Sequence, residues 1–424
     1  MANAMKVQRI DSSVCSHVQH SSWAAHPSHQ QWLINEGQRL LTHYQKARMA
    51  DGFGSLGNDG KLQDQRAKGV VTARMIHCYA LASMMGVPSA GVMADYGIDA
   101  LLDGALRDKV HGGWFEDSYT PSRKNAYLHA FVLIAAGSAT LAQRPRAAEL
   151  LSVVLDIIET HFWQMEESVM QPSFATDWSD AESYQGANCN MHTTEAFLIA
   201  ADATNDDKYL QRALQLGKRF GHDIASAYDW RIPEHFDASW QMLPDYNQDQ
   251  ATDDLRPWGL TPGHFAEWAG LLIKIETALQ QRQQDAPAWL LDNAIALFDS
   301  AMARGWAADG KSGMVYTIGW DDAVSVAIRP YWVQAETANT ALLLARRTGD
   351  RRFEAIYREV WDYIALYLVD YDLGGWRHEV DASGNLSAVV YPHREDLYHD
   401  FQATVTPLIP NSGSIAGGLL RKYS

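Results

Sequence analysis

Residues 190–240 read NMHTTEAFLIAADATNDDKYLQRALQLGKRFGHDIASAYDWRIPEHFDASW. Apolar residues recur at helical spacing over 190–203 and again over 207–226, which predicts two helices. The connection between them, TNDDK, is short and polar, as in a tight turn between antiparallel helices. The segment that follows, 228–240, mixes aromatic and acidic residues in the manner of a longer loop. The stretch therefore predicts a unit of helix, tight turn, helix and long loop.

The same unit recurs along the whole chain. About twelve helices are predicted, over 28–48, 69–86, 90–107, 123–142, 145–163, 190–203, 207–226, 261–281, 286–304, 332–347, 350–369 and 395–420. Long segments that resemble short β-hairpin loops follow alternate helices, at 51–61, 109–122, 162–174, 228–240, 305–322 and 371–386. Because six long loops on one side suit a closed ring better than an open solenoid, we predict an all-α ring with the loops gathered at one mouth.

Tryptophans stand out in these long loops. As a set they are predicted to line the mouth as a platform for a sugar, although a tryptophan can equally well pack in a core. The tryptophans concerned are Trp114, Trp230, Trp240, Trp320 and Trp376. No linker rich in proline or glycine divides the chain, so we predict no domain boundary within the ring.

Charge and cysteine content restrict the partner and the compartment. With 35 basic and 51 acidic residues the formal net charge is −16, which argues against binding nucleic acid or an anionic membrane. Cys15, Cys78 and Cys189 lie far apart and suggest neither a disulfide framework nor a zinc ribbon. With no apolar run of membrane-spanning length, we expect a soluble, cytoplasmic protein whose partner is a small molecule.

Two histidine-containing segments begin helices that are otherwise apolar. His192 and Glu195 are three residues apart and so share a helix face, with Asn188 near the helix start; an ordinary capped histidine is the alternative there. His264 and Glu267 repeat the spacing just after a Pro-Gly helix start. We expect Glu267 to orient the His264 imidazole.

A third segment, HREDLYHDFQ at 393–402, places His399 at the start of a late helix. Two histidines facing one pocket suit removal of a proton next to a carbonyl, because imidazole both takes and returns protons near neutral pH.

Other chemistries find less support. The repeated H-x-x-E order is the reverse of the E-x-x-H found in carboxylate-bridged helical metal sites, so no metal is predicted. A glycosidase needs two paired carboxylates, and the acids Asp245, Asp253, Asp254 and Glu336 leave that possibility open without a pairing signal. The chain has no phosphate-binding glycine loop and no GxSxG motif.

Eight segments in this order resemble the N-acylglucosamine 2-epimerase superfamily, and within it the branch of aldose–ketose isomerases. They are GFGSLGNDG (52–60), TARMIHCYALA (72–82), GALRDKVHGGWF (104–115), NCNMHTTEAFL (188–198), EHFD (234–237), PDYN (244–247), TPGHFAEW (261–268) and DLYHDF (396–401). The resemblance runs from about residue 28 onward. It implies an alpha/alpha six barrel over 28–424, with about twelve helices in two concentric rings, after an amino-terminal tail at 1–27.

The resemblance also implies site residues and an activity. The catalytic histidines fall on His264 and His399, and no cofactor or metal is implied. The positions that hold the sugar fall on Arg74, Tyr127, Asn188, His192, Glu267, Trp332, Glu336 and Trp376. The expected reaction interconverts a free aldose and its ketose through a cis-enediol, in a monomer or homodimer. A 2-epimerase remains the first alternative, and a glycosidase and a non-catalytic sugar-binding protein remain further ones.

One departure from the resemblance bears on the substrate. Relatives that isomerise a sulfonated sugar use an arginine and glutamines around the anion, where this chain has Asp254, His378 and Glu395. Carboxylates repel a sulfonate, so a neutral hexose such as mannose is predicted in preference to the sulfonated sugar.

Overall fold

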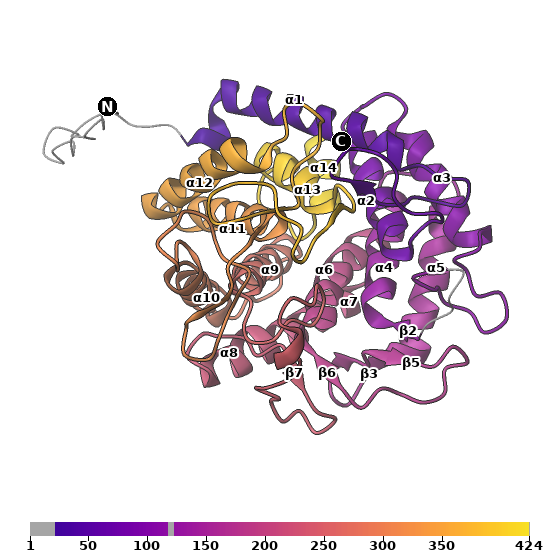
Figure 1. The fold of residues 1–424 in the computed structure, drawn as a ribbon. Helices are drawn as coiled ribbons and strands as arrows, with labels where there is room; N and C mark the ends of the chain where they lie inside the picture. Colours follow the sequence, from indigo (N-terminus) through magenta and orange to yellow (C-terminus); the bar gives the residue numbers. More distant parts are fainter. Residues whose placement is uncertain (1–21, 118–122, 424) are drawn as a thin grey trace, which may run out of the picture.

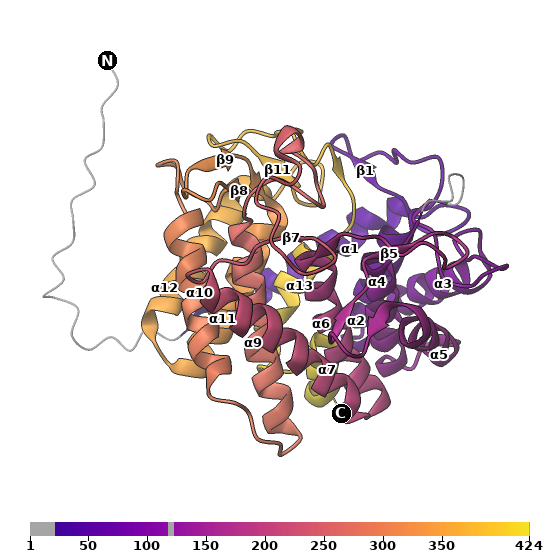
Figure 2. The ribbon, with the colours of Figure 1, turned by 90° about the horizontal axis from the view of Figure 1, so that it is seen from below.

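The computed structural model describes residues 22–117 and 123–423. Helices dominate, and most of the strands lie at one end of the molecule (Figures 1 and 2). The helices are α1 (Pro27–Tyr44), α2 (Gly69–Met84), α3 (Ala90–Asp103), α4 (Ala126–Leu141), α5 (Ala147–Ile157), α6 (Ala187–Thr204), α7 (Asp207–Lys218), α8 (Ala225–Ala227), α9 (Pro262–Gln281), α10 (Trp289–Gly305), α11 (Tyr331–Thr348), α12 (Arg351–Tyr363), α13 (Tyr398–Val405) and α14 (Ile415–Tyr423). Helices α5, α7 and α12 each continue into a π-helical turn, at Ile158–Phe162, Arg219–Ile224 and Ile364–Leu368.

Twelve of the helices in the described ranges form two concentric rings. The inner ring runs α2, α4, α6, α9, α11, α13, and α13 contacts α2 again to close it. The outer helices α3, α5, α7, α10, α12 and α1 each pack mainly on one inner helix, in that order around the ring. The predicted all-α barrel of two concentric rings is thereby confirmed.

Side-chain patterning explains which helices lie inside. Helix α4 is apolar on all sides and almost wholly buried, as a helix surrounded by others requires. Outer helices such as α7 and α12 instead carry one apolar stripe and a charged outer face. Inner helices approach closely: a Cβ on Gly137 of α4 would lie 2.5 Å from Cγ2 of Ile199 on α6. Glycine is therefore required at this crossing.

Short strands lie in the long loops, as the sequence predicted, and they also pair one long loop with another. Of the six two-stranded antiparallel pairs in the described residues, β3–β4 and β8–β9 are hairpins within one loop, whereas β1–β12, β2–β5, β6–β7 and β10–β11 connect different loops. The strands are β1 (Leu56–Gly57), β2 (Lys124–Asn125), β3 (Trp163–Gln164), β4 (Val169–Met170), β5 (Ser173–Phe174), β6 (Gln185–Gly186), β7 (His235–Phe236), β8 (Thr317–Ile318), β9 (Val324–Val326), β10 (Arg329–Pro330), β11 (Glu379–Val380) and β12 (His393–Arg394).

Two single bridges, Lys68 to Asp117 and Leu260 to Ile318, join the remaining pairs of neighbouring loops. Every long loop is thus tied to both of its neighbours. We call this ring of backbone pairing the loop belt. Because its members lie just before the inner helices, the belt fixes where those helices begin.

The two ends of the chain differ from the prediction. The single helix predicted at 395–420 is two helices, α13 and α14, because Pro407 and Pro410 interrupt the hydrogen-bonding pattern between them. Helix α14 packs on α2, α4 and α6 at the end opposite most of the strands (Figure 2). In the predicted tail, Ser22 Oγ donates a hydrogen bond of 2.7 Å to Glu354, while residues 1–21 lie outside the described residues.

Among the described residues, no helix combines the length and the apolarity that crossing a membrane requires.

Candidate active site

The site lies where the six inner helices begin. Each inner helix follows a long loop, so the first turns of all six helices converge at the loop end of the barrel. A cavity with an empty volume of about 530 Å³, including space open to solvent, lies there. Its lining residues are Arg74, Tyr127, Asn188, His192, Asp254, Leu255, His264, Glu267, Tyr331, Trp332, His378, Tyr391, Glu395 and His399. Helix N-termini carry partial positive charge, which favours negative charge developing nearby.

The fold brings most of the predicted site residues together. Eight of the ten line this cavity: Arg74, Tyr127, Asn188, His192, His264, Glu267, Trp332 and His399. They come from α2, α4, α6, α9, α11 and α13, within the first two turns of each helix. Glu336 and Trp376 do not line it.

Glu336 lies directly behind His399. Its Oε1 accepts a hydrogen bond of 2.8 Å from Nδ1 of His399, and both residues are buried. A carboxylate on Nδ1 fixes the tautomer in which Nε2 is the free base. Glu336 therefore contacts the histidine rather than the cavity.

His264 has a different carboxylate partner from the predicted one. Its Nδ1 donates a 2.7 Å hydrogen bond to Oε1 of Glu234, which precedes β7, while Glu267 forms no such bond with it. The prediction that Glu267 orients His264 was wrong, because the imidazole turns toward the loop and not along its own helix. The site thus contains two carboxylate–imidazole pairs, Glu234–His264 and Glu336–His399.

Trp332 lies against both of these histidines. Its ring centroid is 5.1 Å from that of His264 and 6.0 Å from that of His399. Its Nε1 donates a 3.0 Å hydrogen bond to the Tyr391 hydroxyl, which fixes the ring. Trp332 therefore gives the cavity an apolar surface beside the two imidazoles.

Arg74 is a buried cation held on two sides. Its guanidinium donates to Asp396 at 2.9 Å and to the Tyr127 hydroxyl at 2.8 Å, and it lies 4.2 Å from the ring centre of Phe131. Burial opposes its charge, but Asp396, Tyr127 and Tyr331 together outweigh burial and hold the pKa of Arg74 well above its usual value. A permanent positive charge consequently faces the cavity.

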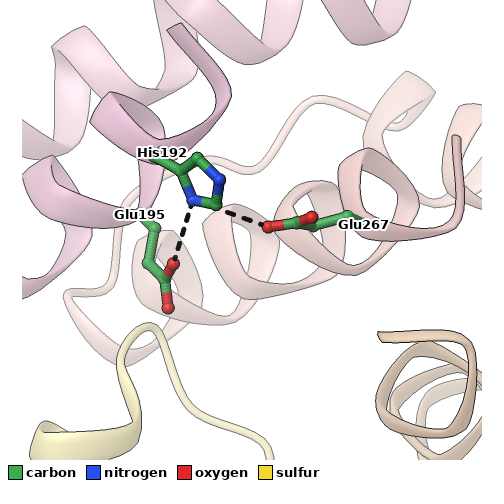
Figure 3. A group of neighbouring side chains, drawn as sticks. All are labelled: His192, Glu195 and Glu267. Carbon is green, nitrogen blue, oxygen red and sulfur yellow. Dashed lines mark ion pairs between the residues drawn. The ribbon is translucent and has the colours of Figure 1, made fainter. Parts of the chain in front are cut away.

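His192, Glu195 and Glu267 form a buried cluster deep in the site (Figure 3). Nδ1 of His192 lies 4.0 Å from Glu195 and 3.7 Å from Glu267. Burial lowers the pKa of His192 to about 4, so the ring is neutral at pH 7.

The two carboxyl groups of this cluster differ in pKa. Burial opposes ionisation of Glu195, but Lys274 and the contacts from His192 and Tyr398 hold its pKa below the usual range. Burial and repulsion from Glu336 and Glu195 instead raise the pKa of Glu267 well above its usual value. Glu195 is therefore ionised at pH 7, whereas Glu267 holds its proton more tightly than an ordinary carboxyl group does.

The predicted role of Trp376 does not fit its position. The residue is fully buried, its Nε1 donates to Glu36 of α1, and its ring packs edge-on against Trp361. Trp114 is likewise buried, with Nε1 bonded to Leu101 O. None of the five loop tryptophans lines the cavity, so the platform prediction was wrong, and for Trp114 and Trp376 core packing was the correct alternative.

Some site residues escaped sequence reasoning. Tyr331 stacks on His378 with ring centroids 3.8 Å apart and contacts His399 edge-on. Tyr391 comes from the last long loop, and Glu234 from the fourth. The segment EHFD carries Glu234 and contributed to the family resemblance, but no spacing rule pairs it with His264, which lies 30 positions later.

Known proteins are similar in sequence to this chain over most of its length. The family model described as N-acylglucosamine 2-epimerase matches residues 52–403. A protein named D-mannose isomerase from Pseudomonas cannabina pv. alisalensis is 44% identical over 94% of this chain and 97% of its own length. A second protein of that name, from Thermobifida fusca, is also 44% identical, over 94% of this chain and 98% of its own.

Solved structures show the same architecture. A crystal structure of a D-mannose isomerase covers 91% of this chain and 99% of its own, with a TM-score of 0.82 and 27% identity. A cellobiose 2-epimerase from Bacillus thermoamylovorans B4167 covers 89% of this chain and 98% of its own, with a TM-score of 0.77 and 19% identity, a likeness of fold alone. The chain belongs to the N-acylglucosamine 2-epimerase family.

Proposed function

We propose that this protein is an aldose–ketose isomerase that interconverts free mannose and fructose. The observation that carries the proposal is the pair of carboxylate-held imidazoles, His264 and His399, facing one cavity. Two relatives that are 44% identical over almost their whole length bear the name D-mannose isomerase. NMR analysis of products from free hexoses tests the proposal: fructose from mannose is expected, whereas an aldose epimer with little ketose would make the protein a 2-epimerase.

In the proposed mechanism His399 is the base at carbon 2. With Nδ1 bonded to Glu336, Nε2 is free to take the C2 proton of the open-chain aldose. The resulting cis-enediol receives the same proton at C1, which yields the ketose. His264, held by Glu234, assists ring opening and moves the hydroxyl proton between O1 and O2.

The remaining groups stabilise charge on the sugar oxygens. Arg74 supplies a fixed positive charge, and the inner-helix N-termini add partial positive charge from the backbone. Glu267 and the neutral His192 ring line the cavity and offer hydrogen bonds to hydroxyl groups of the sugar. We further expect a monomeric or homodimeric enzyme that acts in the cytoplasm on a free monosaccharide.

The acidic wall of the cavity, Asp254 and Glu395, is expected to exclude anionic sugars. Burial and the neighbouring Asp396 raise the pKa of Glu395 to about 7; the other charged groups near it are Arg74, Asp254 and Asp64. Glu395 gains charge as the pH rises through 7, so repulsion strengthens above this pH. We expect the ratio of the inhibition constant of glucuronate to the KM for mannose to rise about fivefold from pH 6 to pH 8. A fivefold change corresponds to about 1 kcal/mol of like-charge repulsion.

Glu395→Gln is the matched variant for this measurement. This variant keeps the size of the side chain but should remove the rise of the ratio with pH. Changes that affect the binding of both sugars equally cancel in the ratio. A ratio that rises equally in the variant would mean that another group carries the effect. The double variant Asp254→Arg with Glu395→Gln should bind a sulfonated hexose more tightly than the unaltered protein does.

Glu336 and Glu234 should contribute to catalysis by holding the imidazoles of His399 and His264 in place. Glu336→Gln and Glu234→Gln keep the side-chain shape but alter the hydrogen bond to Nδ1, so each should lower kcat by about 10²-fold with little change in KM. A loss confined to KM would instead make these residues sugar ligands.

Removal of metal ions should leave turnover intact, because every proposed step uses side chains of this chain. Dialysis against EDTA followed by assay in metal-free buffer is the measurement. Loss of activity that a divalent ion restores would contradict the mechanism.

A further inference from the structure

In the cluster of His192, Glu195 and Glu267, two buried polar atoms have no hydrogen-bond partner. They are Nδ1 of His192 and Oε2 of Glu267, on residues that are only 3% and 6% exposed. An unpaired buried polar atom is costly, and such atoms often mark a place where a ligand binds. Both side chains point toward a common space, which Glu195 borders from the other side (Figure 3).

The spacing of this cluster is close to that of a metal site. One ligand atom from each of His192, Glu195 and Glu267 can be chosen so that all three lie within 4.8 Å of one another. Nδ1 of His192 lies 4.0 Å from Oε2 of Glu195 and 3.7 Å from Oε1 of Glu267. In a tetrahedral zinc site with bonds of about 2.1 Å, two ligand atoms lie about 3.4 Å apart. Small side-chain rotations close that difference.

We propose that His192, Glu195 and Glu267 bind a divalent transition-metal ion, specifically Zn²⁺, and that the bound ion inhibits the enzyme by blocking the sugar cavity. The inhibitory part rests on the proposed isomerase function, whereas the metal site does not. One imidazole and two carboxylates form a three-ligand zinc set, and the fourth position faces the cavity, where water completes the tetrahedron.

The charges around the cluster permit this ion. When both of their carboxyl groups are ionised, Glu195 and Glu267 supply two negative charges to Zn²⁺. The Lys274 ammonium lies 3.9 Å from Oε1 of Glu195, and Oε2 is the oxygen nearer His192. Mg²⁺ is not expected to bind, because it prefers six oxygen ligands in octahedral geometry.

Inhibition should be competitive with mannose, because His192 and Glu267 line the sugar cavity. At a Zn²⁺ concentration ten times its dissociation constant, the apparent KM for mannose should rise about elevenfold with kcat unchanged. EDTA should reverse the effect, and Mg²⁺ at the same concentration should have none.

The direct test uses the full chain without substrate. After EDTA treatment and buffer exchange, calorimetric titration with ZnCl₂ should show one saturable site per chain, and a saturating concentration of mannose should suppress it. Glu267→Gln and Glu195→Gln should lower zinc affinity at least tenfold, while circular dichroism and the melting temperature verify folding. Lack of a one-to-one site in the unaltered protein overturns the proposal, whether or not the variants fold.

Cys189→Ser is the matched control. This buried free thiol lines a neighbouring cavity that shares Tyr127 and Asn188 with the sugar site, so it is a competing zinc ligand outside the proposed cluster. Zinc binding should persist in Cys189→Ser. Loss of binding in Cys189→Ser would assign the metal to the thiol, and full binding in Glu267→Gln would exclude Glu267 as a ligand. Either result overturns the site. Saturable zinc binding in a protein that does not isomerise mannose would overturn the proposed function alone.

Discussion

Replacing His399 with asparagine should lower kcat/KM for mannose by about 10²–10⁴-fold or more and should also abolish exchange of the C2 proton with solvent. Nε2 of His399 is the proposed base, and without it no enediol forms. The asparagine side chain retains a polar group near Glu336, which limits damage to the surrounding packing. Incubation with mannose in D₂O, followed by NMR of both the C2 proton and fructose, measures the two losses together.

His264→Asn should produce a comparable loss of turnover on the cyclic sugar but a different exchange pattern. If His264 handles ring opening and the hydroxyl proton, the rare open-chain aldose can still reach His399. Slow loss of the C2 proton signal in D₂O should therefore survive while fructose formation falls by about 10²-fold or more.

The same two variants distinguish the assignments. Exchange retained without His399 but lost without His264 would interchange the roles of the two histidines. Full activity in both variants would remove imidazole proton transfer from the mechanism, and the melting temperature of each variant shows whether a loss reflects unfolding.

The ring architecture could be predicted because it depends on patterns that are local in the sequence. Helical periodicity shows where helices lie, and the alternation of tight turns such as 204–208 with long loops shows that they come in pairs. The spacing of three residues likewise predicted that His192 and Glu195 share one face of α6. Nδ1 of His192 lies 4.0 Å from Oε2 of Glu195, as this prediction requires.

Contacts between distant segments could not be predicted from such patterns. Spacing along α9 suggested Glu267 as the partner of His264, but the partner is Glu234, which lies next to the strand pair β6–β7. Trp376 was placed in the site by resemblance, yet its hydrogen bond to Glu36 turns it toward α1 and the outer ring. Both Glu234 and Trp376 lie in long loops, whose backbone pairs are too short to leave a periodic signal.

The pairing of α1 with α13 has a consequence for how the chain folds. The first outer helix packs on the last inner one, and the hydrogen bond from Trp376 to Glu36 joins positions 340 apart. Helix pairs such as α6–α7 can form as soon as they are synthesised, but the final closure must await nearly the whole chain and carries a large loop entropy. A nascent polypeptide that ends before α13 is therefore an open arc with exposed apolar inner helices, a species prone to aggregation during translation.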